Sequence, residues 1–313
     1  MKNIYFILGL VMLNSMTPCY GWWLKSTYQD WDFFNHFDFW NADDPTHGYV
    51  NYVDAGTAWN KGYVTVKNGA AYIGTDTQNS AGGRGRDAVR LHSKETVSSG
   101  SLVIADIAHM PTGCGTWPAF WMCGQNWPHG GEIDIIEGVN NINFSQSTLH
   151  TDSGCSMDPG QSWQFTGRWG TNQAGGPSSN CDVNAPGQWA NAGCGILGTD
   201  GSYGQGFNNI GGGVFATKWT DDEISVYYFP RYGIPGDIQS QNPNPDGWGK
   251  PMAKFQIGGN CPGSHFGPQQ IIINLTFCGD WAGGVFGQMC PGQGNCADYV
   301  RDQPWAFQEA YWS

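Results

Sequence analysis

The sequence is poor in charged residues, and in bases above all. Only 13% of its 313 residues are charged, against about 25% in a typical soluble protein. Lys and Arg number 14 against 26 Asp and Glu, which gives a net charge of −12. Because this charge repels a duplex nucleic acid or an anionic membrane, we expect neither as a partner.

The patterns of fibrous and disordered proteins are also missing. The 47 Gly follow no three-residue period, which excludes collagen, and no heptad pattern is present. Aromatics make up 14% of the chain, with 16 Trp, so wholesale disorder is excluded. Abundant Trp with little charge favours binding of neutral polyhydroxy material, because sugar C–H faces lie well on indole. An ordinary β-sandwich with a heavily aromatic core is the alternative.

One apolar run near the start has the character of a targeting signal. Lys2 precedes an apolar run at residues 4–13 and a polar stretch at 14–21. The run is about half the length that spans a bilayer, so we predict a secretory signal peptide at 1–21, cleaved after Gly21. We expect a secreted, extracellular protein with no membrane segment. No linker or repeat divides residues 22–313, which predicts one domain.

Ten cysteines are present, and nine follow the predicted signal peptide. Their spacing lacks the close pairs of zinc sites, so we expect disulfides and one free thiol. Sequons at Asn143 and Asn274 predict N-glycosylation. The second sequon lies inside an apolar run, which favours its occlusion.

Short apolar and aromatic runs alternate with Gly, Asn, Asp and Pro clusters, which predicts an all-β sandwich or barrel. No long segment keeps a helical period, and residues 155–212 predict long loops over the sheets. A short helical turn is expected at 304–310. The predicted strands are 63–66, 70–73, 101–109, 213–219, 223–229 and 271–277. Hairpins are predicted between 63–66 and 70–73 and between 213–219 and 223–229.

Three acids fall close together in the segment GGEIDIIEGVN. Glu132 and Asp134 share one face of a strand, because side chains alternate with period two. Glu137 would then point into the apolar layer, where a carboxylate is costly. One β-bulge near residues 135–136 returns Glu137 to the acidic side. The sequence therefore predicts three carboxyls in a row on one concave face.

Three close carboxyls cannot all ionise comfortably, because like charges raise at least one pKa. A set whose pKa values are pushed apart supplies an ionised nucleophile and a protonated general acid, as glycosidic cleavage requires. Outer carboxyls about 5–5.5 Å apart would retain the anomeric configuration through a covalent intermediate. A solvated strand face is the alternative, since acids at this spacing also arise by chance.

Further segments surround these acids in a fixed order. They are DPTHGYVNYVD at 44–54, CGTWPAFW at 114–121, WP at 127–128, GEIDIIEG at 131–138, TLHT at 148–151 and IIINLTFCGDWA at 271–282. Together they resemble the laminarinase branch of glycoside hydrolase family 16, with the closest likeness to secreted fungal endo-1,3(4)-β-glucanases. The resemblance covers nearly all of residues 22–313. It implies a β-jelly-roll of two curved antiparallel sheets with a concave substrate cleft.

The resemblance also assigns roles. Glu132 becomes the nucleophile and Glu137 the acid/base, and Asp134 between them orients the nucleophile. His150 falls beside the acids, where its ring can donate to a carboxylate. A structural His in the core is the alternative.

Five further residues match the cleft of the family. Trp121, Trp127 and Trp281 match tryptophans that stack on glucose rings, and Asn51 and Arg90 match polar residues of the glycone subsites. For the tryptophans the alternative is core packing, and for Arg90 it is a structural ion pair.

The chain departs from the family pattern at three places. Cys123 stands where relatives carry another residue, so we expect it to be the free thiol. One residue is missing between Trp121 and Trp127, which alters a cleft loop. The sequence ends at Ser313, before the final strand of its relatives, and a sheet without that strand would expose an unpaired ladder.

The function predicted is that of a secreted retaining endo-β-glucanase. It would hydrolyse internal β-1,3 bonds, and β-1,4 bonds next to β-1,3-linked glucose, in a β-glucan polysaccharide. A non-catalytic β-glucan-binding protein on the same fold is one alternative, and a transglycosylase using the same acids is another. This chemistry requires no cofactor, no acidic loop has calcium-ligand spacing, and a monomer is expected.

Overall fold

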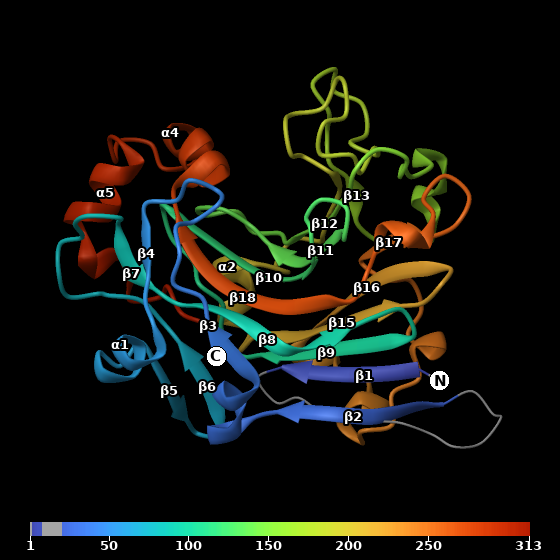
Figure 1. Cartoon of the computed structure of the whole chain (residues 1–313), viewed down its shortest axis with the longest axis horizontal. Coiled ribbons are helices and arrows are strands. Elements are labelled where there is room, and N and C mark those ends of the chain that lie inside the picture. Colours follow the sequence, from blue (N-terminus) through green and yellow to red (C-terminus); the bar gives the residue numbers. More distant parts are fainter. Residues whose placement is uncertain (1, 8–20) are drawn as a thin grey trace.

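The computed structural model describes residues 2–7 and 21–313. Its two main β-sheets are stacked, with the eight-stranded sheet above the six-stranded one in Figure 1. The larger sheet runs in the order β13 (Arg168–Trp169), β14 (Cys194–Leu197), β12 (Gln146–His150), β11 (Glu132–Glu137), β10 (Thr116–Gly124), β18 (Gln269–Phe277), β8 (Arg90–Val97) and β3 (Phe37–Phe39). The smaller sheet runs in the order β17 (Ala253–Gln256), β16 (Glu223–Pro230), β15 (Gly213–Trp219), β9 (Ser101–Ile107), β1 (Lys2–Ile7) and β2 (Trp22–Tyr28).

Two small strand pairs and several short helices flank these sheets. The pairs are β4 (Val50–Tyr52) with β7 (Arg86–Ala88), and β5 (Val64–Lys67) with β6 (Ala70–Ile73). The α-helices are α1 (Ala55–Asn60), α2 (Gly204–Asn209), α3 (Gly236–Gln239), α4 (Gly284–Met289) and α5 (Cys296–Asp302). The 3-10 helices are η1 (Asp30–His36), η2 (Pro159–Gln164), η3 (Arg231–Gly233), η4 (Pro245–Gly247), η5 (Gly263–His265) and η7 (Pro304–Phe307), and η6 (Gly279–Gly283) is a π-helical turn.

The apolar core lies between the two main sheets and fixes which face of each strand is turned outward. Ile133 of β11 and Leu149 of β12 are fully buried, as is Ile104 of β9 in the opposite sheet. Burying one such side chain contributes about 1.5–3 kcal/mol. Because neighbouring residues of a strand face opposite sides, this burial turns Glu132 and Asp134 onto the outer face of the larger sheet.

Four disulfides anchor the loops and the C-terminal helices. Cys114–Cys290 and Cys278–Cys296 tie α4 and α5 to the ends of β10 and β18, and Figure 1 shows these helices above one end of the larger sheet. The long loops are held by Cys155–Cys261 and Cys181–Cys194. Cys123 is the free cysteine among residues 21–313, as predicted.

The predicted all-β jelly roll is confirmed, and so are both hairpins, the strands at 101–109 and 271–277 and the turn at 304–310. Residues 155–212 are mostly loops, as predicted, although they include β13, β14 and α2. One strand departs from the antiparallel pattern expected of the two sheets, because β1 pairs in parallel with both β2 and β9.

The predicted signal peptide at 1–21 stays a prediction. Part of it forms β1, and residues 1 and 8–20 lie outside the described residues. The absence of a final strand also stays a prediction. Near the end of the sequence, Trp312 is buried and exchanges two backbone hydrogen bonds with Ile73. Within the described ranges, no helix has the length and apolar character needed to cross a bilayer.

Candidate active site

A β-bulge in β11 determines where the three acids point. Asp134 pairs with Trp121 of β10 and Ile136 pairs with Phe120, so the intervening Ile135 has no partner on that strand. The pairing with β12 shifts at the same place, between Asp134 and Glu137. Ile135 and Ile136 are both fully buried, whereas Glu137 is partly exposed. The register therefore confirms the predicted bulge and puts all three carboxyls on the outer face.

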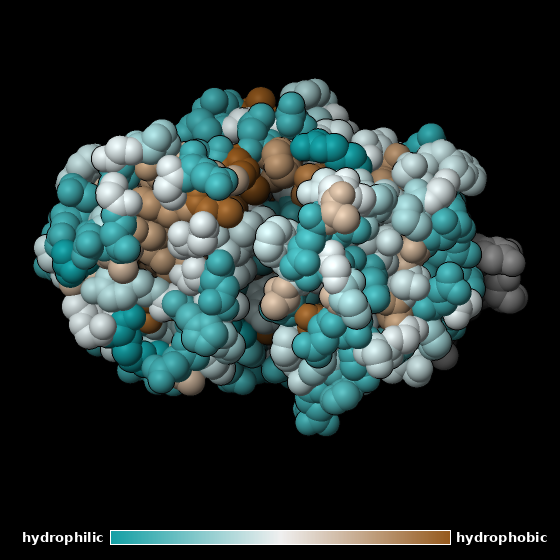
Figure 2. Space-filling view, turned by 90° about the horizontal axis from the view of Figure 1, so that it is seen from above, coloured by the Kyte–Doolittle hydropathy of each residue, from teal (hydrophilic) through white to brown (hydrophobic). Residues whose placement is uncertain are grey.

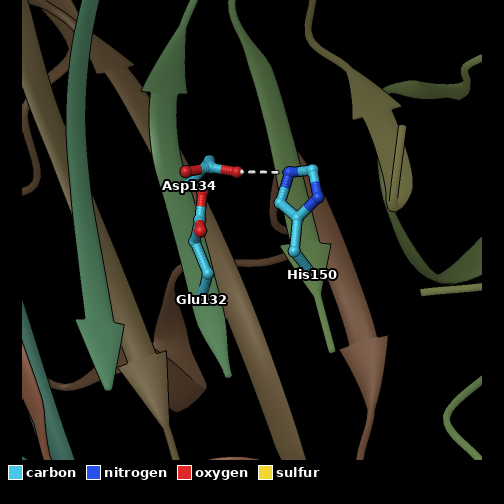
Figure 3. A group of neighbouring side chains, drawn as sticks. All are labelled: Glu132, Asp134 and His150. Carbon is cyan, nitrogen blue, oxygen red and sulfur yellow. Dashed lines mark ion pairs between the residues drawn. The ribbon is translucent and has the colours of Figure 1, made fainter. Parts of the chain in front are cut away.

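His150 completes a compact group with two of the acids. It lies opposite Glu132 in the β11–β12 pairing, and its Nε2 is 3.0 Å from Asp134 Oδ2. Figure 3 shows the imidazole and the Asp134 carboxyl pointing toward each other from neighbouring strands, with Glu132 directed toward Asp134. Ligand atoms of the three residues lie within 4.8 Å of one another. A cation could use this spacing if it displaced the protons of the carboxyls, because metal ligands must be deprotonated.

Burial keeps protons on these acids. It raises the pKa of Glu132 to about 8, with a further increase from the neighbouring Asp134 charge. Burial likewise raises the pKa of Glu137 to about 7 and that of Asp134 well above its usual range, where the charge of Glu137 adds to the effect. At mildly acidic pH the group therefore holds at least one carboxylic acid that can donate a proton.

Each outer acid also has an indole donor. Trp117 Nε1 donates to Glu137 Oε1 at 2.8 Å. The Trp127 side chain hydrogen-bonds to the Glu132 carboxyl and lowers its pKa, against the larger effect of burial. Sequence analysis named Trp127 but missed Trp117. The available signal was the period of two, which places Trp117 on the same face of β10 as Trp121.

Arg90 of β8 and Trp121 of β10 lie close together on the larger sheet, on the side of β11 where β10 pairs with it. The Arg90 guanidinium carbon is 5.1 Å from the Trp121 ring centroid and 4.4 Å from that of Trp40. Arg90 Nε donates to His92 Nε2 at 2.9 Å. Burial, with the nearby Arg90 charge, lowers the pKa of His92 to about 4, so its ring is neutral and can accept this bond. The Arg90 side chain is thus held rigidly beside a cleft tryptophan.

Asn51 is connected to this group only indirectly. Trp121 Nε1 donates to Asn274 Oδ1 at 2.7 Å, and Asn274 Nδ2 donates to the Tyr52 hydroxyl at 3.2 Å. Asn51, the residue before Tyr52, donates to Asp87 Oδ1 at 2.6 Å and lines an open pocket of about 340 Å³. The Asn51 amide therefore turns toward Asp87. Asn274 is only 5% exposed, so the second sequon is occluded.

The predicted tryptophans lie on different sides of the acids. Trp281, in η6, packs edge-on against Trp117 with ring centroids 5.8 Å apart, which puts it on the Glu137 side. Trp127 contacts Glu132 and is 44% exposed. Seen from above, the surface is largely hydrophilic, and hydrophobic residues gather around a hollow near its middle (Figure 2).

A carboxylate between two imidazoles clasps the loop that carries Trp127. Asp152 Oδ2 is 2.7 Å from His129 Nδ1, and Asp152 Oδ1 is 2.7 Å from His265 Nδ1. Gly130 O accepts from the backbone N–H of Gly267 at 3.1 Å. We call His129, Asp152 and His265 the loop clasp. It joins two loops and η5 beside the start of β11, and no sequence pattern predicts it.

Comparison with known proteins matches this chain to one family. The sequence profile described as XgeA-like, catalytic GH16 domain matches residues 37–313. The chain belongs to glycoside hydrolase family 16. The resemblance found from the sequence is thereby confirmed, and the bulged strand β11 lies within the matched residues.

Several relatives in family 16 have names or solved structures. An endo-1,3(4)-β-glucanase of Arthroderma benhamiae is 46% identical over 97% of this chain, which spans 66% of that relative's length. Laminarinase 16A from Phanerochaete chrysosporium, solved with 6-O-glucosyl-laminaritriose in donor and acceptor sites, is 42% identical, with a TM-score of 0.84 over 92% of this chain and 95% of its own. An elongating family 16 β-1,3-glucosyltransferase is 42% identical, with a TM-score of 0.83 over 92% and 96%.

Proposed function

We propose that this chain is a retaining endo-β-glucanase that cleaves internal β-1,3 linkages, and β-1,4 linkages next to β-1,3-linked glucose. The observation that carries the proposal is the bulged strand, which turns Glu132, Asp134 and Glu137 to one face of the larger sheet. Glucanase and laminarinase relatives support the substrate class.

In the first step, the Glu132 carboxylate attacks the anomeric carbon of the bound glucose unit. Glu137, as a carboxylic acid, gives its proton to the glycosidic oxygen, so that bond breaks and a glycosyl–Glu132 ester forms. The charge on Glu132 is favoured by the Trp127 hydrogen bond and by His150, both of which lower its pKa. Asp134, whose pKa burial and the charge of Glu137 raise well above its usual range, lies between the two glutamates and orients the nucleophile.

In the second step, water attacks the same carbon and breaks the ester. Glu137, now a carboxylate, takes the proton from that water, and Glu132 is released ionised. Two inversions at one carbon give net retention. Trp117 donates to Glu137 Oε1 and favours its charged form, which is the form that acts as the base here.

The substrate would lie in the hollow of Figure 2. Trp121, Trp127 and Trp281 supply apolar faces for sugar rings, and Arg90 supplies donors that its neighbours hold in place. Asn51 would contact a more distant sugar, because it faces the separate pocket beside Asp87.

Substituting Glu132→Gln tests the nucleophile, because it removes the charge while nearly preserving shape. Reducing-sugar release from laminarin and lichenan should fall by at least about 10³-fold, with circular dichroism and melting temperature close to wild type. NMR of the first products should show the β-anomer from the wild-type protein. Near-native turnover by Glu132→Gln, or an α-anomer as first product, would contradict the mechanism.

A transglycosylase is the second candidate, and a specific observation favours it. The glucosyltransferase relative matches this chain as well as the laminarinase does. A sugar hydroxyl in place of water would complete the same second step. Products longer than the substrate, formed at high acceptor concentration and exceeding the hydrolysis products, would identify a transferase. Binding of glucan without any product would instead identify a non-catalytic binding protein.

We also propose that the protein is secreted as a monomer. The predicted signal peptide and the four disulfides support an oxidising, extracellular location. Expression of the full chain in a eukaryotic host tests this, because the medium should contain a protein whose N-terminus begins near residue 22. A product retained in the cells with residues 1–21 intact would contradict it.

A further inference from the structure

Two tryptophans lie side by side on the surface, away from the carboxyls. Trp31 in η1 is 64% exposed and Trp59 in α1 is 38% exposed. Their ring centroids are 6.3 Å apart, with 23° between the ring planes. Single exposed hydrophobic residues are common, but two adjacent indoles from separate elements form a larger apolar surface that most proteins bury. We call this pair the tryptophan platform.

The platform is held rigidly from beneath. Phe34 is buried and meets Trp59 edge-on, with centroids 5.0 Å apart. Ala58, the residue before Trp59, is fully buried, and the Asp54 side chain caps α1 by accepting from the Thr57 backbone N–H. A partner that stacks on these rings would therefore lose little conformational entropy in ordering them.

The paired rings offer an apolar surface to a sugar ring. The two indoles are nearly parallel and offset, with their centroids 6.3 Å apart, and their high exposure leaves ring surface on which the C–H face of a sugar can lie. Exposed polar side chains lie next to them, with Asn60 following Trp59 and Asp30 preceding Trp31. These groups offer an amide and a carboxylate to hydroxyls, and the acidic protein surface disfavours an anionic polymer.

The position of the platform points to the same polymer as the cleft. The larger sheet continues from β11 through β10, β18 and β8 to its edge strand β3. The element η1 directly precedes β3 and packs against β2, β3, β5, β6 and β8. Because Phe37 pairs with Ser93, η1 lies at the same edge as β8 but at the other end of the pairing from Arg90. A glucan must therefore extend beyond the cleft and along this edge to reach Trp31, which only a long polymer can do.

We propose that Trp31 and Trp59 form a second binding surface for an uncharged β-linked glucan, outside the catalytic cleft. It holds the polymer by stacking while another part of the same chain is cleaved. This inference rests on the proposed function for the identity of the polymer, and on the exposure and pairing of the two indoles for the site itself.

The test compares Trp31→Ala/Trp59→Ala with Trp305→Ala, which removes a single 65% exposed tryptophan elsewhere. All variants carry Glu132→Gln so that the polymer is not degraded. Retardation is measured in gels that contain laminarin, with and without a saturating five-glucose β-1,3-oligosaccharide that occupies the cleft. We expect the oligosaccharide-resistant retardation to weaken about tenfold in the double variant and to stay unchanged in Trp305→Ala.

A second measurement uses proteins with Glu132 intact. The platform variant should lose about tenfold more kcat/KM on insoluble β-1,3-glucan than on the five-glucose oligosaccharide. Trp31→Ala alone, which removes the more exposed ring, should also lose more kcat/KM on insoluble β-1,3-glucan than on the oligosaccharide. Because it keeps Trp59, this variant serves if loss of Trp59 destabilises α1. The inference is overturned by equal retardation of platform variant and control, by equal losses on polymer and oligosaccharide, or by wild-type dimers that the double variant abolishes. A wild-type protein that releases no sugar from any glucan would instead overturn the proposed function, whatever the gels show.

Discussion

Replacing Trp117 with Phe should change the pH dependence of the reaction through a single hydrogen bond. The variant keeps an aromatic ring but loses the indole N–H that donates to Glu137 Oε1 at 2.8 Å. Such a bond to a charged group contributes about 1.5–3 kcal/mol. Since one pKa unit corresponds to about 1.4 kcal/mol, and water in the open cleft compensates part of the loss, the pKa of Glu137 should rise by about one unit.

The sign of the effect follows from the role of Glu137. Burial raises its pKa to about 7, and the Trp117 bond works in the opposite direction by favouring the carboxylate. The acid must be protonated in the first step, so kcat/KM falls as pH rises through this pKa. In Trp117→Phe the alkaline limb should move to higher pH by about one unit. Initial rates on laminarin between about pH 4 and pH 10 give both limbs, whose apparent pKa values belong to the coupled acids together.

Trp121→Phe is the matched control. Its indole N–H donates to Asn274 and not to a catalytic carboxyl. We therefore expect a higher KM in this variant with an unmoved alkaline limb. The reasoning is refuted if Trp117→Phe is folded and active and its limb coincides with that of the wild type, or if both variants shift it equally.

Three further predictions concern the surroundings of the acids. Asp152→Asn should lower the melting temperature by about 2 °C and raise KM without moving the alkaline limb. Because hydrogen bonds from His129 and His265 depress the Asp152 pKa, this difference should begin to shrink as the pH falls below about 4, the pKa of an unfolded Asp, and vanish only at the lower pH where folded Asp152 is protonated as well. The Cys123 thiol, whose pKa burial and Glu132 raise to about 12, should react with iodoacetamide at pH 8 only after denaturation, and rapid native alkylation would contradict its placement. Treatment with EDTA should leave initial rates within about 20%, whereas a loss restored by a divalent cation would show that Glu132, Asp134 and His150 hold a metal.

The orientation of β11 could be predicted from the sequence because burial alone decides it. A carboxylate at Glu137 cannot remain in the apolar layer, and one extra residue is the smallest change that removes it. The hairpins were predictable for a similar reason, since local turn signals and a period of two determine each pair. Such features depend on residues close together along the chain.

The partners of the acids could not be predicted in this way. The sequence places Trp117 on the correct face of β10, but it does not show the side-chain conformation that brings Nε1 to Glu137. The loop clasp unites residues more than a hundred positions apart, and no local pattern announces that His129 and His265 meet on Asp152. Asn51 was named from a matching motif, but the motif did not reveal that its amide turns toward Asp87.

In the proposed mechanism, one strand supplies two chemically identical side chains that act in different protonation states, and the surroundings of each side chain favour its state. The donor to Glu137 comes from β10, a central strand whose position the whole sheet fixes. The donor to Glu132 comes from an exposed loop, which the clasp at Asp152 secures. The acid/base environment is therefore built into the core of the fold, whereas the nucleophile environment depends on contacts between loops. Changes in loop sequence can then tune the nucleophile, and the balance between water and sugar as acceptor, while the bulged strand and its general acid stay intact.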